Sequence, residues 1–146
     1  MFTFKQTPAR QPDGTPVAVT IVSGPVIIEN GQVLLDKHGG DGYWKFPGGA
    51  LLDDVSPRQH AIKQGRLELG LELEPTGEPF IIAFNRHPQD LLEHVILIHY
   101  PARRLNREIK PSPDIEAWAW FALDKLPLDS APNIKPAVEY FTRPYK

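Results

Sequence analysis

The segment from residue 46 to residue 71 constrains the fold most strongly, because it encodes a tight loop and both ends of one helix. Ser56 has the character of an N-cap, Pro57 suits the first helical position, and Gln59 is placed to close a capping box. Gly70 readily adopts the left-handed conformation at which helices end. The spacing predicts one helix of about three to four turns between these two signals.

Short runs of apolar and β-branched residues on both sides of this helix predict strands. Asn30 and Gly31 provide the positive φ angles of a type I′ turn, so the runs that flank them predict a hairpin. The apolar run at 94–100 is continuous, which predicts a buried strand. Strands are expected at 17–22, 26–29, 32–37, 80–84, 94–100 and 117–122, with a short helix at 134–141. This order favours an α+β or layered α/β/α domain with a mixed sheet.

The composition of the 146 residues, with 41% apolar and 23% charged residues, is typical of an ordinary globular protein. At this length we expect one domain over residues 1–146. The formal net charge of −2 provides no long-range attraction to polyanions, so we expect no nucleic-acid partner and no membrane partner. Residues 1–5 lack the apolar region of a signal peptide, and no apolar run approaches the roughly 20 residues of a membrane span, so the expected location is cytoplasmic. The sequence leaves the oligomeric state open.

From Gly49 to Leu71 the sequence resembles the Nudix box, whose pattern is G-x5-E-x7-R-E-U-x-E-E-x-G-U with U a bulky aliphatic residue. Gly49, Glu68, Gly70 and Leu71 occupy matching places, and residues 46–49 resemble the usual lead-in. The resemblance implies the Nudix fold, with α/β/α layers around a mixed β-sheet. It also implies cleavage of a pyrophosphate bond in a nucleoside diphosphate derivative by metal-activated water, with Mg or Mn as cofactor.

The departures from this pattern concern its chemistry. Val55, Gln64 and Leu67 stand at three of the four places where the pattern has glutamate, and Lys63 stands where it has arginine. Glu68 alone remains of the four acids. The retained spacing, with three of the four acids lost, therefore predicts a hydrolase with a weakened or altered metal site. The alternative is a catalytically inactive Nudix-fold module that binds a nucleotide.

The predicted metal ligands are Glu68, Gln64 and His60, since helical spacing places them on one face together with Leu67. Cysteine is absent, so a metal must be held by oxygen or imidazole. One carboxylate, one amide and one imidazole suit magnesium poorly, whereas manganese, cobalt or zinc tolerates the imidazole better. An acid from the preceding loop, such as Asp53, would improve the site if the loop shifted.

The other candidate site residues lie outside this face. Gly48 and Gly49 would let backbone approach a phosphate, and Trp44 and Arg104 are candidates for substrate binding. Glu116, together with Glu68, is a candidate catalytic residue, because by resemblance some Nudix enzymes recruit a base from this region. Three of these candidates have an alternative interpretation without a functional role. Trp44 would belong to the core, the basic run around Arg104 would be a solvated face, and Glu68 would be a surface acid. A third and more distant alternative is a protein-interaction domain whose pocket is closed by Tyr43, Trp44 and Leu67.

Overall fold

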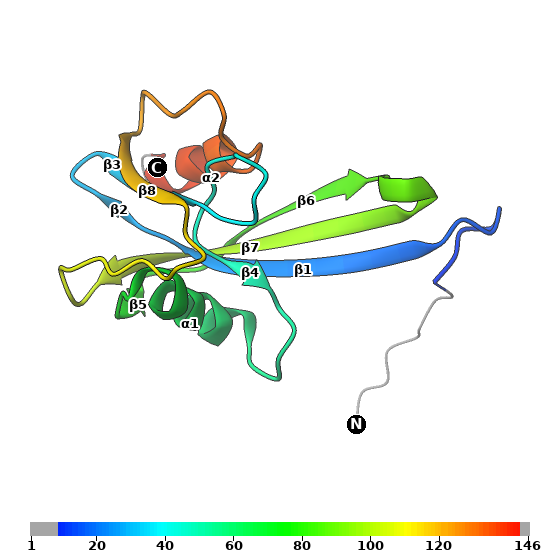
Figure 1. Ribbon diagram of the computed structural model, residues 1–146, viewed down its shortest axis with the longest axis horizontal. Coiled ribbons are helices and arrows are strands. Elements are labelled where there is room, and N and C mark those ends of the chain that lie inside the picture. Colours follow the sequence, from blue (N-terminus) through cyan, green and yellow to red (C-terminus); the bar gives the residue numbers. More distant parts are fainter. Residues whose placement is uncertain (1–8, 144–146) are drawn as a thin grey trace.

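The computed structural model describes residues 9–143, which form two sheets and two α-helices (Figure 1). The larger sheet is mixed, as the sequence predicts: β1 and β7 run parallel, and the other strands pair with them in antiparallel fashion. Its order is β4-β1-β7-β5, with β6 also paired to β7. The strands are β1 (Val17–Val26), β4 (Gly49–Ala50), β5 (Leu73–Pro75), β6 (Phe80–Arg86) and β7 (Leu92–Arg104). Residues 1–5, on which the absence of a signal peptide was argued, lie outside the described part.

The smaller sheet contains β2 (Ile28–Glu29), β3 (Gln32–Lys37) and β8 (Ala117–Ala122), all antiparallel. Asn30 and Gly31, which connect β2 to β3, have φ angles of 51° and 74°. The predicted hairpin is thereby confirmed, because β2 and β3 pair in antiparallel fashion across a turn whose two residues both have positive φ.

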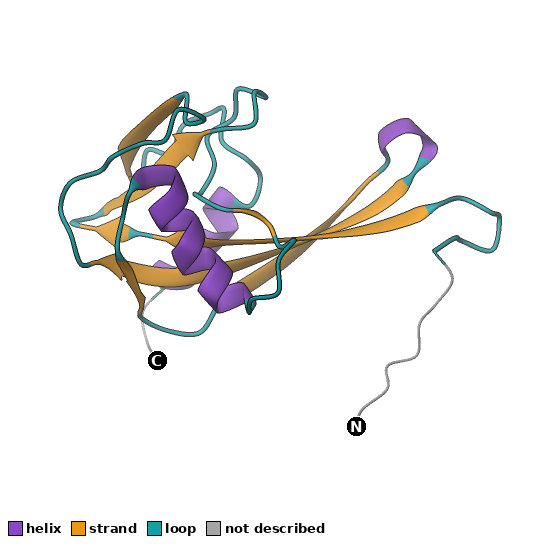
Figure 2. Ribbon diagram, turned by 60° about the horizontal axis from the view of Figure 1, so that its bottom comes forward, coloured by secondary structure: helices purple, strands orange, loops and turns teal. Residues whose placement is uncertain are grey.

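Helix α1 (Pro57–Leu69) begins and ends where the sequence predicts. The Ser56 side chain accepts from the Gln59 backbone, the Gln59 side chain accepts from the Ser56 backbone, and Gly70 is left-handed with φ 65°. The helix packs on β1, β5 and β7, on one face of the larger sheet (Figure 2). Helix α2 (Ile134–Thr142) lies on the opposite side, where it contacts β6 (Figure 1). These are the α/β/α layers expected from the sequence.

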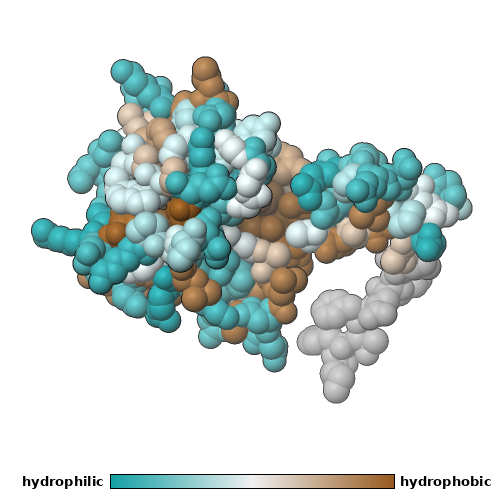
Figure 3. Space-filling view, viewed as in Figure 1, coloured by the Kyte–Doolittle hydropathy of each residue, from teal (hydrophilic) through white to brown (hydrophobic). Residues whose placement is uncertain are grey.

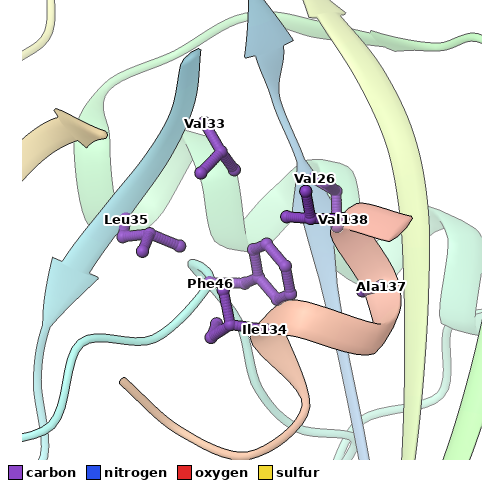
Figure 4. Close-up of a cluster of buried hydrophobic side chains, with 7 residues drawn as sticks. All are labelled: Val26, Val33, Leu35, Phe46, Ile134, Ala137 and Val138. Atoms are coloured by element: carbon purple, nitrogen blue, oxygen red, sulfur yellow. The ribbon is translucent and has the colours of Figure 1, made fainter. Parts of the chain in front are cut away.

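Strand β3 is buried on both faces, because its alternating side chains enter two core clusters. Val33 and Leu35 point into the cluster beneath α2 (Figure 4), whereas Leu34 joins a cluster beside α1. The first cluster comprises Val26, Val33, Leu35, Phe46, Ile134, Ala137 and Val138. The second comprises Ile27, Leu34, Leu69, Leu71, Leu73 and Ala102. Packing from both sides fixes the position of the strand, and with it the position of Asp36 near its end.

The first half of β1, β6 and the first half of β7 project from the body as an arm, which ends in the short 3-10 turn η1 (Pro88–Asp90) (Figures 1 and 3). Val19, Ile21 and Ile81 on this arm are 61%, 36% and 57% exposed. The prediction that the run at 94–100 is buried was wrong for most of its residues, which are half-buried. The helices pack on the other end of these strands and leave the arm uncovered. Within residues 9–143, no helix has the length and apolar character needed to cross a membrane.

Candidate functional site

The fold brings together three polar side chains from two distant segments: Asp36 in β3, His38 just after β3, and Glu68 in the last turn of α1. One ligand atom from each lies within 4.8 Å of the other two. Nδ1 of His38 is 2.5 Å from Oδ1 of Asp36 and 3.6 Å from Oε1 of Glu68. Two carboxylates and one imidazole therefore share a small and largely desolvated space.

Backbone pairing holds this cluster in place. The N–H of Asp36 donates to the carbonyl of Lys45, and the N–H of Lys45 donates back to Asp36, at 2.9 and 2.8 Å. The Lys45 ammonium donates to the carbonyl of His38 at 3.0 Å and forms an ion pair with Asp41 at 2.6 Å. The glycine-rich connection at 39–42 is thus closed into a loop, and the position of His38 follows from it.

Burial and the close approach of the three groups shift the pKa values of Glu68 and His38. Desolvation, followed by the neighbouring Asp36 carboxylate, raises the pKa of Glu68 to about 8, while His38 and the N–H of Gly48 act in the opposite direction. The hydrogen bond to Asp36 raises the pKa of His38. Each shift has the direction expected for acids crowded around an imidazole, and a bound cation would favour the ionised acids.

The Gly48–Gly49 loop lies directly against β1 and against Glu68. The N–H of Gly48 donates to Oε2 of Glu68 at 2.6 Å, and Gly49 pairs with Ser23 in β1. A Cβ on Gly24 would lie 1.9 Å from the carbonyl oxygen of Pro47, and Gly48 has a φ of 154°. Glycine is therefore required on both sides of this approach, and the predicted position of Gly48 and Gly49 at the sheet edge is confirmed.

His60 and Gln64 do not join Glu68 in the cluster. His60 is 5% exposed, its Nε2 lies 3.0 Å from the carbonyl oxygen of Gly49, and its Nδ1 lies 3.6 Å from Oδ1 of Asp53. A Cβ on Gly49 would lie 2.4 Å from Nε2 of Gln64, so this amide packs against the glycine loop. Of the three predicted metal ligands, only Glu68 belongs to the cluster with Asp36 and His38.

Trp44 and Arg104 are both engaged with other protein groups. Trp44 packs edge-to-face on Phe121, with ring centroids 4.8 Å apart, and contributes to the core cluster beneath α2. Arg104 donates to both carboxylate oxygens of Glu29, at 2.6 and 2.8 Å, and its guanidinium lies 5.1 Å from the ring centroid of Trp120. These contacts agree with the core alternative for Trp44 and show that Arg104 would have to share its guanidinium with a substrate.

Glu116 lies near the loop that follows His38. Its Oε1 accepts from the N–H of Gly40 at 3.1 Å. This places the second candidate catalytic residue beside the glycine-rich loop that follows His38, and outside the cluster.

A separate cleft lies elsewhere on the molecule. A cleft of about 1080 Å³ is lined by residues of β2, β7 and α2, among them Ile28, Ala102 and Tyr140. Neither Asp36, His38 nor Glu68 lines it. Although large clefts are common binding sites, the convergence of ligating groups is more specific, and it favours the cluster as the chemical centre.

Sequence reasoning missed Asp36 and His38. A signal was present, because Asp36 directly follows the apolar run of residues 33–35 in a strand that the hairpin predicts. An acid that follows three buried apolar residues in one strand requires a partner if it is also buried.

Comparison with known proteins identifies the family. The family model described as NUDIX domain matches residues 19–141. The chain belongs to the Nudix family. This match covers most of the chain, and the predicted family and fold are thereby confirmed.

Solved structures similar to this Nudix domain include a MutT NUDIX hydrolase from Burkholderia pseudomallei, with 27% identity, a TM-score of 0.68, and coverage of 85% of this chain and 98% of that chain. A NUDIX hydrolase from Nitrosomonas europaea has 18% identity, a TM-score of 0.70, and coverage of 84% and 87%. An ADP-ribose pyrophosphatase from Streptococcus suis has 21% identity, a TM-score of 0.63, and coverage of 87% and 94%. No curated protein matches the chain by sequence.

The site of this Nudix domain does not fit magnesium on the box face of α1. Glu68 is the one carboxyl group on that face, and one of its oxygens already accepts the N–H of Gly48. The buried Asp36 carboxylate, whose Oδ2 has no hydrogen-bond partner within residues 9–143, offers a second charged ligand from β3. The donor set that fits a divalent cation is therefore the one that combines α1 with β3.

Proposed function

We propose that this Nudix domain hydrolyses a pyrophosphate bond in a nucleoside diphosphate derivative, at a metal site altered from the family pattern. One observation carries the proposal: the Glu68 carboxylate is held at the junction of α1 and the Gly48–Gly49 loop, within 3.6 Å of the His38 imidazole. A glycine loop that admits phosphate beside groups that accept protons is the arrangement such a reaction needs.

The residues of the chain have separable roles in this proposal. The Gly48–Gly49 loop would receive the diphosphate beside the Glu68 carboxylate and the Gln64 amide, and the Gly48 N–H, which donates to Glu68, would have to turn to a phosphate oxygen. Glu68 in its ionised form would take the proton of the attacking water, beside Asp36 and His38, which are hydrogen-bonded to each other in the metal-free chain. The water oxygen adds to one phosphorus, and the bridging oxygen leaves with the other phosphate. A bound divalent cation would neutralise charge on the phosphate oxygens and lower the pKa of the water.

The roles predicted for Glu116, Trp44 and Arg104 belong to the same proposal. Glu116, which lies beside Gly40, would take part in proton transfer. Trp44 would contact the nucleobase, and Arg104 would contact a phosphate. A phosphate at Arg104 would have to compete with the two-point ion pair to Glu29.

A second candidate function is a module that binds the nucleotide without hydrolysing it. It is favoured by the absence of acids at Val55, Gln64 and Leu67, which leaves α1 with one charged ligand. Both candidates bind a nucleoside diphosphate derivative, and turnover alone separates them.

The test is a turnover assay over a panel of nucleoside diphosphate derivatives, with Mg²⁺, Mn²⁺ and Co²⁺ supplied separately. ADP-ribose belongs in the panel because one structural neighbour is named for it. We expect release of a nucleoside monophosphate from at least one compound, and a loss of at least about 100-fold on Glu68→Gln. Glu72→Gln is the matched control, because Glu72 is exposed and paired with Arg66.

The outcomes are distinct. Binding of a nucleotide without turnover would support the module, and neither binding nor turnover would overturn both candidates. Glu116→Gln in the same assay decides whether Glu116 takes part in proton transfer.

A further inference from the structure

The acid on β3 is unusual for its position. Asp36 is fully buried, directly after three strand residues that supply both core clusters, and His38 contacts only its Oδ1. Its Oδ2 has no hydrogen-bond partner among the described residues. A buried carboxylate with an unused oxygen requires a positive group or a donor to offset its desolvation.

The surrounding geometry suits a shared ion. Ligand atoms that bind one divalent cation at about 2.1 Å lie about 3 to 4 Å from one another. Atoms of Asp36, His38 and Glu68 already lie within 4.8 Å of one another, so small rotations of the side chains suffice. The hydrogen bond between Asp36 and His38 would give way to coordination.

The helix by itself cannot supply such a set. Leu67 is 57% exposed and carries no ligand atom, and Gln64 packs on Gly49. His60 contacts the carbonyl of Gly49 through Nε2 and faces Asp53 through Nδ1 at 3.6 Å, so it does not point to Glu68. Glu68 is therefore the contribution of α1, and the remaining ligands come from the end of β3.

We propose that the metal centre of this Nudix domain is built from Asp36, His38 and Glu68, and that it prefers a borderline cation such as Mn²⁺, Co²⁺ or Zn²⁺ to Mg²⁺. Two ionised carboxylates balance the charge of a divalent ion. An imidazole ligand suits these cations, whereas Mg²⁺ prefers oxygen ligands in an octahedral shell. The inference rests on the proposed function only in that the ion would serve the same site.

The experiment titrates the metal-free, tag-free full chain with Co²⁺ in the absence of nucleotide. We expect visible d–d absorption bands that saturate at one ion per chain, and a paramagnetically shifted imidazole N–H signal in the proton NMR spectrum. His38→Gln should abolish that signal and weaken Co²⁺ affinity by at least about 10-fold, and Asp36→Asn should weaken it similarly. A tenfold excess of Mg²⁺ over Co²⁺ should leave the bands in place.

Two further variants make the assignment specific. His87→Gln is the matched control, because His87 is exposed on the arm, and it should bind Co²⁺ like the parent. His60→Gln should also retain the bands. Because His38 is partly exposed, its variant tests the site even if Asp36→Asn fails to fold.

Three results would overturn the inference: no Co²⁺ binding by the folded parent, binding unaffected by His38→Gln, or loss of the imidazole signal in His60→Gln alone. Failure of the proposed function looks different, because Co²⁺ would bind as described while no compound in the panel is hydrolysed. Conversely, turnover that survives His38→Gln unchanged would leave the function standing and remove the metal assignment.

Discussion

His99 in β7 is a buried titratable residue outside the candidate site. It is 3% exposed, its ring lies 4.9 Å from that of Phe46, and its Nε2 lies 3.0 Å from the amide nitrogen of Asn133. Burial lowers the pKa of His99 to about 4. The folded protein therefore holds a neutral imidazole at this position at neutral pH.

This depressed pKa predicts a loss of stability in acid. Above its ordinary value of 6.5 the contribution of His99 is fully present, and it is lost as the pH falls from 6.5 through about 4. The loss should be on the order of 3 kcal/mol. Urea unfolding of the parent and of His99→Leu between pH 4 and 7 should show a smaller pH dependence in the variant, while His87→Gln follows the parent. Parallel curves for parent and His99→Leu would contradict the prediction.

Gly24 permits the glycine loop to lie on β1, which predicts a second effect at a single residue. Gly24→Ala would place a methyl group 1.9 Å from the carbonyl oxygen of Pro47, which is backbone and cannot move freely. We expect a loss of about 2 kcal/mol or more in the free energy of unfolding. Gly77→Ala is the control, because its nearest atom would be 3.5 Å away. Equal urea midpoints for Gly24→Ala and Gly77→Ala would show that the loop at Pro47 moves to accommodate the methyl group.

Among the elements, helix α1 combines local and non-local determinants. Its ends are set by Ser56 and Gly70, but its inner face depends on the sheet. Gly65 stands where the family pattern has an aliphatic residue, and a Cβ there would lie 2.3 Å from Cδ1 of Leu73. Leu73 of β5 thus occupies the space that a larger helix residue would need.

The capping box predicts the effect of changing the start of α1. Ser56→Ala removes the acceptor for the Gln59 backbone N–H, which lies 3.1 Å from the Ser56 hydroxyl. The free energy of unfolding should fall by about 1 kcal/mol. Ser56→Asp should restore most of this loss, because aspartate also caps helices well. If Ser56→Ala and Ser56→Asp unfold at the same urea concentration, a capping side chain at this position stabilises the helix no more than water does.

At the scale of the whole molecule, the body and the arm differ in how they are stabilised. The body contains both core clusters and is covered by α1 and α2. On the arm, Glu93 accepts from Thr20 at 2.6 Å and from Arg86 at 2.8 Å, so a polar network links β1, β6 and β7. Exposed apolar residues such as Val19 and Ile81 add little burial there.

This difference predicts uneven protection against hydrogen exchange. Amides of the hydrogen-bonded arm at 92–96 should exchange at least about tenfold faster than those of β3, because opening the arm exposes little new apolar surface. Exchange measured residue by residue by NMR tests this directly. Uniform protection across both regions would show that the arm and the body unfold as one unit. Glu93→Gln should further speed exchange on the arm and leave β3 unchanged.

The sequence by itself determined the features that depend on neighbouring residues. The Asn30–Gly31 turn and the two ends of α1 were predictable because they follow from backbone conformation and short-range hydrogen bonds. The family was also predictable, since the spacing of Gly49, Glu68 and Gly70 is kept although most acids are lost.

Tertiary structure alone decided which side chains meet. Helical spacing placed His60 and Glu68 on one face, but packing turned His60 to the carbonyl of Gly49 and brought Glu68 to His38, 30 residues away in the chain. The same holds for the three-residue strand β5, which pairing with β7 creates. Such contacts depend on how the layers pack, because local periodicity fixes the direction of a side chain and not the group that it reaches.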